Sequence, residues 1–389
     1  MTTSPFQPGF GSFPPALVGR DEILRRVGER LDEGSPEQYL VRGHRGMGKT
    51  VLLSAMEDTA TDRGWVVLSE IATPGVVDHL VGTTIVRALA KVQGTPIDRI
   101  VTGASIASLG GITTSATRRN QEVPSLYSRL SDLFDAIAER NPHSGILLTL
   151  DEVEKNSLTD TSTIGAAVQQ LRRDNRPIAF AAAGLPHQLD QLLDFPHTTF
   201  LRRAIRIDVA PLGWDSARIA LLEPIATNGR HIDPADLDRA TAATYGYPYL
   251  TQLIGDVAWR ATPDAEAISA ADVDAAIARA TELMGSMVHE PALITLTTQQ
   301  RDYLAAMADT DGPAATSTVA EHLGITIQAA SNVRAVLEDQ GLIFQPRRGQ
   351  VDFATPYFRE YLVRHGAHPS RAPVAFTGTF GPTSADSTD

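Results

Sequence analysis

Short apolar runs alternate with longer stretches in which apolar residues recur every three or four positions, from residue 16 to residue 210. Residues 39–41 and 65–68 have the length and composition of buried strands, and the stretch after each has the period of an amphipathic helix. Strands that alternate with helices are typical of βαβ units, which build a parallel sheet. The pattern therefore predicts an α/β domain over residues 16–210.

Three later runs complete the predicted sheet. Residues 146–150 are apolar except for Thr149, which is typical of a central parallel strand buried on both faces. Residues 178–183 have the same character. Residues 200–209 are the fifth strand candidate.

One segment of the core departs from this pattern. Residues 105–115 alternate around the pair Gly110-Gly111, which is a signal for a two-residue hairpin turn. We expect a β-hairpin inserted near residues 100–118. Such a hairpin contacts DNA or a neighbouring subunit, or it is an insertion without a binding role.

Beyond residue 210 the strand pattern gives way to helical periodicity. Residues 211–290 are predicted to form a small helical region, called the lid below. In residues 291–365, the capping-box pair Thr297 and Gln300 begins the first of three predicted helices, and a hairpin follows them. Three helices and a hairpin in this order resemble a winged helix-turn-helix.

Composition restricts the possible class of protein and its possible partners. Residues 1–15 and 366–389 are rich in Pro, Gly, Ser and Thr, so we expect a loose, disordered arm and a disordered tail. The chain has no cysteine, which removes disulfides and fits a cytoplasmic protein. We expect neither a secretory signal nor a membrane span, which would need roughly 20 apolar residues in a row. The net charge of −12 argues against a chain that coats nucleic acid without a local basic patch.

The first chemical motif follows the strand at residues 39–41. Residues 43–50, GHRGMGKT, fit G-x-x-x-x-G-K-[ST], the phosphate-binding loop of P-loop NTPases. Its glycines let backbone N–H groups point at one centre, and the next helix adds the positive end of its dipole. We expect Lys49 to contact the terminal phosphates and the Thr50 hydroxyl to hold Mg²⁺. The predicted nucleotide-binding residues here are Gly43, Arg45, Gly46, Met47, Gly48, Lys49, Thr50 and Val51.

The second chemical motif is the acidic pair Asp151-Glu152, at the end of the strand over residues 146–150. Ligands bind at the carboxyl ends of parallel strands, so this pair is expected to meet the glycine loop. Asp151 would hold Mg²⁺ through its water shell, and Glu152 would orient and deprotonate the attacking water. Glu154 is a nearby alternative base. The two motifs together predict an ATPase with Lys49 and Glu152 as catalytic residues.

The order of motifs over residues 16–365 resembles one family, the bacterial and archaeal ATPases of the AAA+ and STAND group, similar to origin-recognition-type initiators. Val-Gly-Arg at residues 18–20 precedes the glycine loop. Gly-Leu-Pro follows a strand at residues 184–186, and Gly-Tyr-Pro stands at residues 246–248. The resemblance implies a P-loop NTPase parallel sheet with a helical lid, followed by a winged helix domain, and ATP with Mg²⁺ as cofactors. The absence of an Asn-Lys-x-Asp guanine signature also favours ATP over GTP.

The resemblance also implies roles for individual residues. In this family the turn corresponding to Val18, Gly19 and Arg20 packs on the adenine, and the lid proline, here Pro248, rests near the nucleotide. Each feature fits an ordinary turn or helix start as well. The strand over residues 178–183 is mostly Ala and lacks the polar sensor 1 residue, which places the chain nearer the STAND branch and leaves the hydrolysis rate open.

Three arginines are further candidates for the reaction. Arg202 or Arg203, beside the fifth strand candidate, would act as an arginine finger on the nucleotide of a neighbour, which implies a homo-oligomer in the ATP state. The alternative is a surface arginine cluster. Arg260 is a candidate sensor 2 residue by its position alone.

Double-stranded DNA is the partner that a winged helix suggests. The third helix, expected over residues 326–340, would enter the major groove, and the hairpin tip would meet phosphates. The C-terminal domain carries more Asp and Glu than Lys and Arg, however, so it also fits a contact with protein. The predicted DNA-binding residues are Gln328, Ser331, Asn332, Arg334, Arg347 and Arg348.

Two functions remain open on these grounds. The first is an ATP-dependent switch that binds DNA through its winged helix and changes its oligomeric state with the nucleotide. The second is a signalling or scaffold ATPase whose winged helix packs on its own lid or on a partner protein. A metabolic P-loop kinase fits less well, because no acceptor site is evident and the C-terminal domain would be unexplained.

Overall fold

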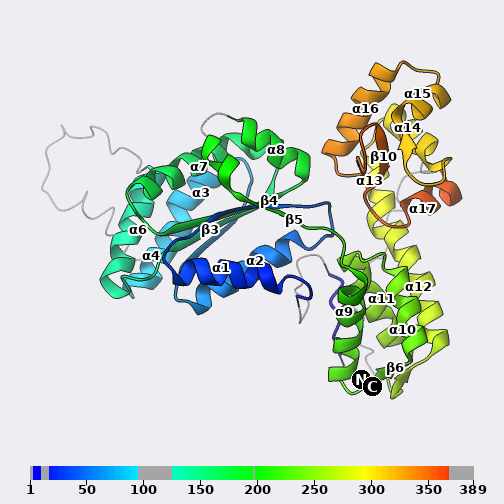
Figure 1. Cartoon of the computed structure of the whole chain (residues 1–389), viewed down its shortest axis with the longest axis horizontal. Coiled ribbons are helices and arrows are strands. Elements are labelled where there is room, and N and C mark those ends of the chain that lie inside the picture. Colours follow the sequence, from blue (N-terminus) through cyan, green and yellow to red (C-terminus); the bar gives the residue numbers. More distant parts are fainter. Residues whose placement is uncertain (1–2, 10–16, 95–124, 196–197, 368–389) are drawn as a thin grey trace, which may run out of the picture.

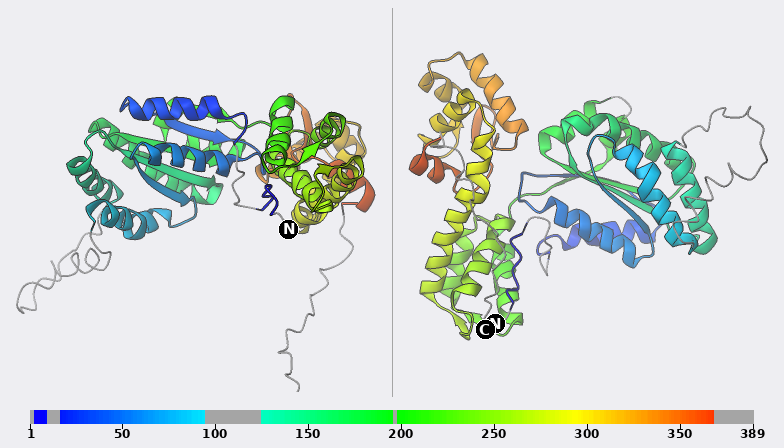
Figure 2. Two further views of the ribbon diagram at one scale, coloured as in Figure 1. Left: turned by 90° about the horizontal axis from the view of Figure 1, so that it is seen from below. Right: turned by 180° about the vertical axis from the view of Figure 1, so that it is seen from behind.

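The computed structural model describes residues 3–9, 17–94, 125–195 and 198–367. An α/β core, the helical lid and a C-terminal domain follow one another along the chain (Figure 1). The lid and the C-terminal domain both lie at one end of the core (Figure 2). The hairpin expected near residues 100–118 and all but the first two residues of the expected tail lie outside the described residues.

The core contains the expected parallel sheet, with its strands in the order β2-β3-β4-β1-β5. β1 is an inner strand, with β4 on one side and β5 on the other. The chain therefore leaves the carboxyl end of β1 at an inner position of the sheet. Ligands bind at the carboxyl ends of the strands in α/β folds. The strands are β1 (Gln38–Arg42), β2 (Val66–Ile71), β3 (Ile146–Val153), β4 (Ile178–Gly184) and β5 (Ile205–Asp208).

Helices cover both faces of this sheet (Figure 1). α1 (Asp21–Asp32) and α2 (Lys49–Asp62) pack on the face that buries Val41, whereas the other helices pack on the face that buries Leu40. Burial on both faces accounts for the nearly continuous apolar runs of the strands. The second layer contains α3 (Val76–His79), η1 (Leu80–Thr84), α4 (Ile85–Gln93), α6 (Leu126–Arg140), η2 (Lys155–Ser157), α7 (Leu158–Arg173) and α8 (Pro186–Asp194).

The last strand is shorter than the sequence suggests. The segment before it forms a 3₁₀ helix, η3 (Thr199–Arg203), and β5 begins only at Ile205. A strand needs a neighbouring strand for its backbone hydrogen bonds. Only Tyr39 to Arg42 of β1 pair with β5, so β5 is limited to four residues. The expectation of a strand over residues 200–209 is therefore wrong for its first half.

The lid shares an apolar cluster with the core. Leu221, Ile254 and Trp259 of the lid join the same buried cluster as Val41 and Leu52 of the core, so the two parts are packed against each other. The lid contains α9 (Trp214–Thr227), β6 (His231–Ile232), α10 (Pro234–Ala243), α11 (Pro248–Ala261), β7 (Ala267–Ile268) and α12 (Ala270–Met284).

The N-terminal segment differs from the loose arm expected over residues 1–15, as far as residues 3–9 are concerned. The Phe6 side chain is only 2% exposed and belongs to the cluster that core and lid share. Its ring lies against Gly255 of α11, where a Cβ atom would come within 2.4 Å of it. A single aromatic residue in a polar stretch thus anchors this segment to the lid.

The C-terminal domain has the winged helix arrangement. It is joined to the lid by a nearly continuous helical rod made of α12, η4 (Gly285–His289) and α13 (Glu290–Ile294) (Figure 1). Its small sheet has the order β8-β10-β9, and a helix that the sequence pattern did not predict, α17, follows the hairpin. The elements are α14 (Thr298–Ala308), β8 (Ala314–Ala315), α15 (Thr316–His322), α16 (Ile327–Asp339), β9 (Ile343–Phe344), β10 (Gln350–Phe353) and α17 (Phe358–His365).

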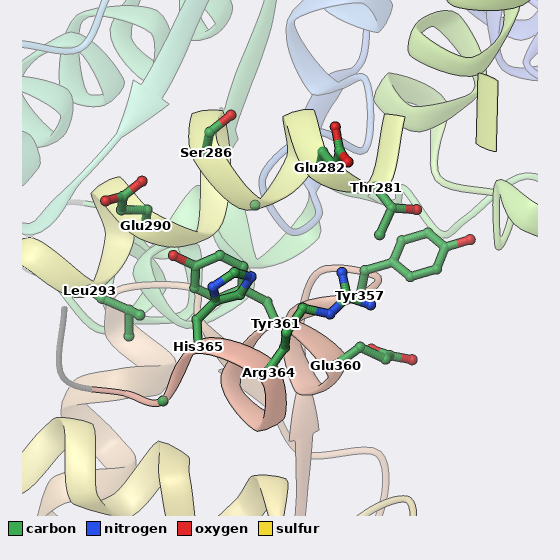
Figure 3. Close-up of a pocket in the computed structure, with 12 residues that line it drawn as sticks. Thr281, Glu282, Ser286, Glu290, Leu293, Tyr357, Glu360, Tyr361, Arg364 and His365 are labelled. Carbon is green, nitrogen blue, oxygen red and sulfur yellow. The ribbon is translucent and has the colours of Figure 1, made fainter. Parts of the chain in front are cut away.

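A hollow of about 310 Å³ lies where the rod meets α17 (Figure 3). The rings of Tyr361 and His365 stack along it, with their centroids 4.7 Å apart. Behind Tyr361, the imidazole of His289 is 1% exposed and stacks on Phe358 at 4.8 Å. Burial lowers the pKa of His289 to about 4, so this ring is neutral where the rod joins the winged helix.

This burial predicts an acid-sensitive contribution to stability. The pKa of His289 lies below the value of about 6.5 for an unfolded chain, so the unfolded state binds the extra proton and stability falls as the pH drops from about 6.5 towards 4. We expect wild type to lose about 2 kcal/mol more than a His289→Leu variant between pH 7 and pH 5. Urea unfolding at both pH values measures the difference, and parallel losses in the two proteins would contradict it.

Candidate functional site

The glycine loop connects the carboxyl end of β1, an inner strand of the sheet, to the start of α2. Gly46 and Gly48 have φ angles of +73° and +85°, a region that other residues rarely adopt. Gly48 is also the N-cap of α2, so the free N–H groups of the first helical turn face the same space as the loop. The local backbone therefore has the form that binds a polyphosphate.

Lys49 lies at the start of α2 and is largely buried. Its Nζ atom donates a hydrogen bond to the carbonyl oxygen of His44, at 2.9 Å. Burial lowers the pKa of Lys49 to about 8, against a smaller opposing effect of Asp151. The ammonium group thus contacts the loop itself, where an anionic ligand would offer a stronger partner.

The carboxyl end of β3 brings the acidic pair to the loop. The Thr50 hydroxyl donates to Oδ2 of Asp151 at 2.6 Å, although 101 positions separate the two residues. Glu152 has a φ of +54° and donates its backbone N–H to Oδ1 of Asp151, at 2.8 Å. This turn leaves the Glu152 side chain exposed beside the pair. A hydroxyl and a carboxylate side by side are hard oxygen ligands of the kind that Mg²⁺ prefers.

A cavity of about 430 Å³ opens between the loop, the ends of β3 and β4, the lid and the N-terminal segment. Both candidate bases, Glu152 and Glu154, face it, so the geometry leaves that choice open. Two predicted loop residues do not line it: Gly43 packs on Val209, and Met47 is buried in the core. The lining residues are Gln7, Gly9, Arg45, Gly46, Gly48, Lys49, Thr50, Val51, Asp151, Glu152, Glu154, Gly184, Leu185, Gln188, Pro248, Tyr249 and Gln252.

The Val18-Gly19-Arg20 turn is not among the residues that line this cavity. Gly19 lies against Ser216 at the start of α9, where a Cβ atom would be 3.0 Å from the serine hydroxyl. Arg20 donates to the carbonyl oxygen of Ala210, at 2.8 Å. These contacts fix the chain where it passes from β5 to the lid, so the residues hold the core and the lid together.

The lid reaches the site through Pro248 and, more deeply, through Tyr247. The Tyr247 hydroxyl donates to the carbonyl oxygen of Arg45 at 2.9 Å. It occupies the space over Gly46, where a Cβ atom would lie 2.0 Å from the hydroxyl. The sequence analysis missed Tyr247, because only the neighbouring Pro248 belongs to a motif.

Gln188 is a second residue that sequence reasoning missed. It lies on α8, one turn after β4, is 7% exposed and lines the cavity. Its Nε2 atom donates to the carbonyl oxygen of Asp339 in the winged helix domain, at 3.4 Å. The strand end itself has no polar side chain, as expected, but this amide places a polar group close to it.

The winged helix domain packs directly on the α/β core. The Phe344 ring of β9 lies 5.1 Å from the ring of His44 in the glycine loop. His187 and Asp339 approach within 3.9 Å, and Leu185 lies against Gly341. All three parts of the chain therefore meet at the glycine loop.

The arginines predicted as fingers lie far from this cavity within the chain. They precede β5 and therefore lie at the amino ends of the parallel strands. The glycine loop, in contrast, follows the carboxyl end of β1. Arg202 donates to the carbonyl oxygen of Leu193 at 3.2 Å and pairs with Asp194 at 3.4 Å. Arg203, in contrast, lines a hollow of about 460 Å³ together with Arg172 and Arg173. No carboxylate among the described residues pairs with Arg203.

The sensor 2 candidate Arg260 pairs with Asp256 on the exposed side of α11, at 2.8 Å. Neither residue lines the cavity at the glycine loop. The described part of the chain therefore offers no contact between Arg260 and the glycine loop.

The predicted DNA-binding residues separate into exposed and occupied groups. Arg347 and Arg348 are exposed at the tip between β9 and β10, and Gln328 and Asn332 are exposed on α16 and bond to each other at 3.2 Å. Arg334 is only 22% exposed and is not free for a ligand. Its guanidinium donates to the Thr316 hydroxyl at 3.1 Å and lies 3.5 Å from Glu338. Ser331 is half-buried.

Comparison with known proteins agrees with this geometry. Residues 16–180 match the family described as AAA ATPase domain, and residues 286–362 match a domain of unknown function (DUF8462). Residues 16–180 are thus similar to an AAA ATPase domain, which agrees with the glycine loop and the parallel sheet in this part of the chain. A comparison with curated proteins found no match.

Solved structures share the fold over about nine tenths of the chain. A Walker-type ATPase of Pyrococcus abyssi superposes with a TM-score of 0.60 at 16% identity, covering 89% of this chain and 96% of that one. The ORC2 protein of Aeropyrum pernix, solved in complexes with ADPNP and ADP, gives a TM-score of 0.58 at 13% identity, covering 92% and 96%. Within the described residues, no helix is long and apolar enough to cross a bilayer.

The position of Lys49 generates a direct test of the site. Replacing Lys49 with Ala removes the only ammonium group that lines the cavity among the described residues, so we expect the affinity for ATP to fall at least about a hundredfold. Isothermal titration calorimetry measures the change. Lys91→Ala, on the exposed surface of α4, is the control and should bind ATP as wild type does. ATP binding of equal strength in all three proteins would refute the placement of the phosphates.

Proposed function

We propose that this chain is an ATP-binding and ATP-hydrolysing switch that binds double-stranded DNA through its winged helix and changes its assembly state with the nucleotide. The observation that carries the proposal is the meeting of core, lid and winged helix at the glycine loop. A ligand in this loop touches the parts that would have to respond to it.

The residues present fit ATP together with Mg²⁺. Lys49 and the loop N–H groups bind the phosphates, while Thr50 and Asp151 hold the cation. When bound, Mg²⁺ neutralises charge that develops on the phosphate oxygens. The ADPNP and ADP complexes of the similar ORC2 protein support a nucleotide at this position of the fold.

In hydrolysis, Glu152 is the proposed base for the attacking water. Its side chain is exposed to the cavity, and the left-handed turn of its backbone directs it away from the buried strand. Glu154 is the alternative, because it lines the same cavity.

The lid would transmit the nucleotide state to the winged helix. Tyr247 contacts the loop, and Tyr245, two residues earlier, meets Tyr357 of the winged helix domain edge to face at 5.3 Å. A triphosphate that recruits Lys49 away from the His44 carbonyl changes the loop that Tyr247 touches. Movement of this loop therefore reaches the winged helix through one hydrogen bond and one contact between aromatic rings.

For the proposed homo-oligomer, Arg203 is a better arginine finger than Arg202. Arg202 is engaged by Asp194 and by a backbone carbonyl, whereas Arg203 stands beside Arg172 and Arg173 with no carboxylate partner among the described residues. Glu37 also lines this hollow, but its carboxylate pairs with Arg26 and Arg30. An arginine without a carboxylate partner at a surface hollow is suited to meet the phosphates of a second copy.

For DNA binding, the wing tip is the basic surface of the domain. Arg347 and Arg348 are exposed and make no ion pair among the described residues, so both are available for phosphates. Gln328 and Asn332 present amide groups on the exposed face of α16, where base edges would be read.

A second function is favoured by a specific contact. The end of α16 and β9 pack on the core through Asp339, Gly341 and Phe344, which ties part of the winged helix to its own chain. A signalling or scaffold ATPase would use such a contact to hold the domain until the nucleotide changes, and would then offer it to a protein partner.

Titration of a labelled duplex by fluorescence anisotropy, with and without ATP, separates these functions. We expect binding that weakens with salt, and an Arg347→Ala/Arg348→Ala variant that binds more weakly with a salt slope reduced by about 2. A matched control replaces Arg25 and Arg87, which are exposed on the core. Absence of salt-dependent binding in both nucleotide states, together with a nucleotide-driven change of mass in light scattering, would establish the second function instead.

Single-residue variants also test the assignment of the base. Glu152→Gln keeps the size of the side chain but removes its basicity, so we expect ATP binding within about twofold of wild type and hydrolysis slower by about a hundredfold or more. Steady-state release of phosphate measures the rate, with Glu154→Gln as the comparison. Normal turnover in Glu152→Gln and loss of turnover in Glu154→Gln would move the role to Glu154.

A further inference from the structure

We infer that the N-terminal strap, defined as residues 3–9, forms a wall of the nucleotide site and that Gln7 and Gln252 bind the base. This inference rests on the proposed binding of ATP and adds the group that recognises its base. The strap lines the cavity through Gln7 and Gly9, which lie far in sequence from every motif of the site.

The strap is held on the lid by specific contacts. The Phe6 ring is 2% exposed and lies on Gly255 of α11, a position that has no room for a side chain. One residue later, the backbone N–H of Gln7 donates to Oε1 of Gln252, also on α11, at 3.1 Å. These contacts fix the strap at the mouth of the cavity by an apolar anchor and a hydrogen bond.

The charges that line the cavity divide it into two parts. Every charged lining residue belongs to the glycine loop, α2 or the end of β3, where the phosphates and the cation are expected: Arg45, Lys49, Asp151, Glu152 and Glu154. The strap and the lid contribute only uncharged groups, namely Gln7, Gly9, Pro248, Tyr249 and Gln252. Outside the glycine loop and α2, the remaining uncharged residues, Gly184, Leu185 and Gln188, come from the end of β4 and the start of α8. With the phosphates at the charged part, the base of the nucleotide lies against the uncharged wall.

The hydrogen bond from the strap also fixes how the Gln252 amide is oriented. A backbone N–H bonds only to the oxygen of a carboxamide, so Oε1 faces Gln7 and Nε2 remains as a donor. A donor in this position suits an acceptor nitrogen of a purine ring. The Gln7 carboxamide, on the same wall, provides both a donor and an acceptor.

The test compares ATP with inorganic tripolyphosphate, which lacks a base. In calorimetric titrations, we expect Gln252→Leu and Phe6→Ala to weaken ATP binding about tenfold. Tripolyphosphate binding should stay at the wild-type level in both variants. Gln170→Leu, an exposed glutamine on α7, is the matched control and should change neither ligand. Thermal unfolding of each variant checks that the lid remains folded.

Other results would overturn the inference in distinguishable ways. ATP binding at the wild-type level in both variants would show that the strap does not contact the base. Equal weakening of ATP and tripolyphosphate would show that the strap only supports the fold. If Lys49→Ala loses both ligands in these cases, the proposed nucleotide site stands without the strap. If wild type binds neither ligand, the proposed function and the inference fail together.

Discussion

The hydrogen bond from Tyr247 to the carbonyl of Arg45 determines how the lid sits on the core, and it exists only because Gly46 leaves room for the phenol. The same short turn is held at its other end, where the Tyr357 hydroxyl of the winged helix domain donates to the carbonyl of Ala243 at 2.9 Å. A turn of a few residues, from position 243 to position 247, thus joins all three parts of the molecule. The glycine loop contacts this turn through Tyr247 and contacts the winged helix directly through His44 and Phe344.

The turn and its partner contain two of the non-glycine residues with a left-handed backbone. Tyr245 and Tyr357 have φ angles of +50° and +62°, which residues with a Cβ atom adopt at a cost of roughly 1–3 kcal/mol each. The two rings contact each other, so the strained positions form one joint between the lid and the winged helix. Such a joint is suited to a switch, because a different arrangement could release the strain and offset lost contacts.

The sequence was sufficient for features that depend on local pattern. The α/β sheet and the meeting of Thr50 with Asp151 followed from apolar runs, glycine spacing and the rule that ligands bind at the carboxyl ends of parallel strands. Phe6 could not be placed, because its burial depends on Gly255 of a helix that is distant in sequence. Arg334 was predicted to bind DNA, but its side chain is long enough to fold back onto Thr316 of the preceding helix.

The rod of α12, η4 and α13 has a mechanical consequence. From Ala270 to Ile294 it is roughly 37 Å long at the rise of an α-helix, and it belongs to the lid at one end and to the winged helix at the other. Rotation of the lid by about 10° would therefore carry the far end of such a lever through about 6 Å. A small rotation of the lid would therefore become a displacement as large as a side chain at the winged helix.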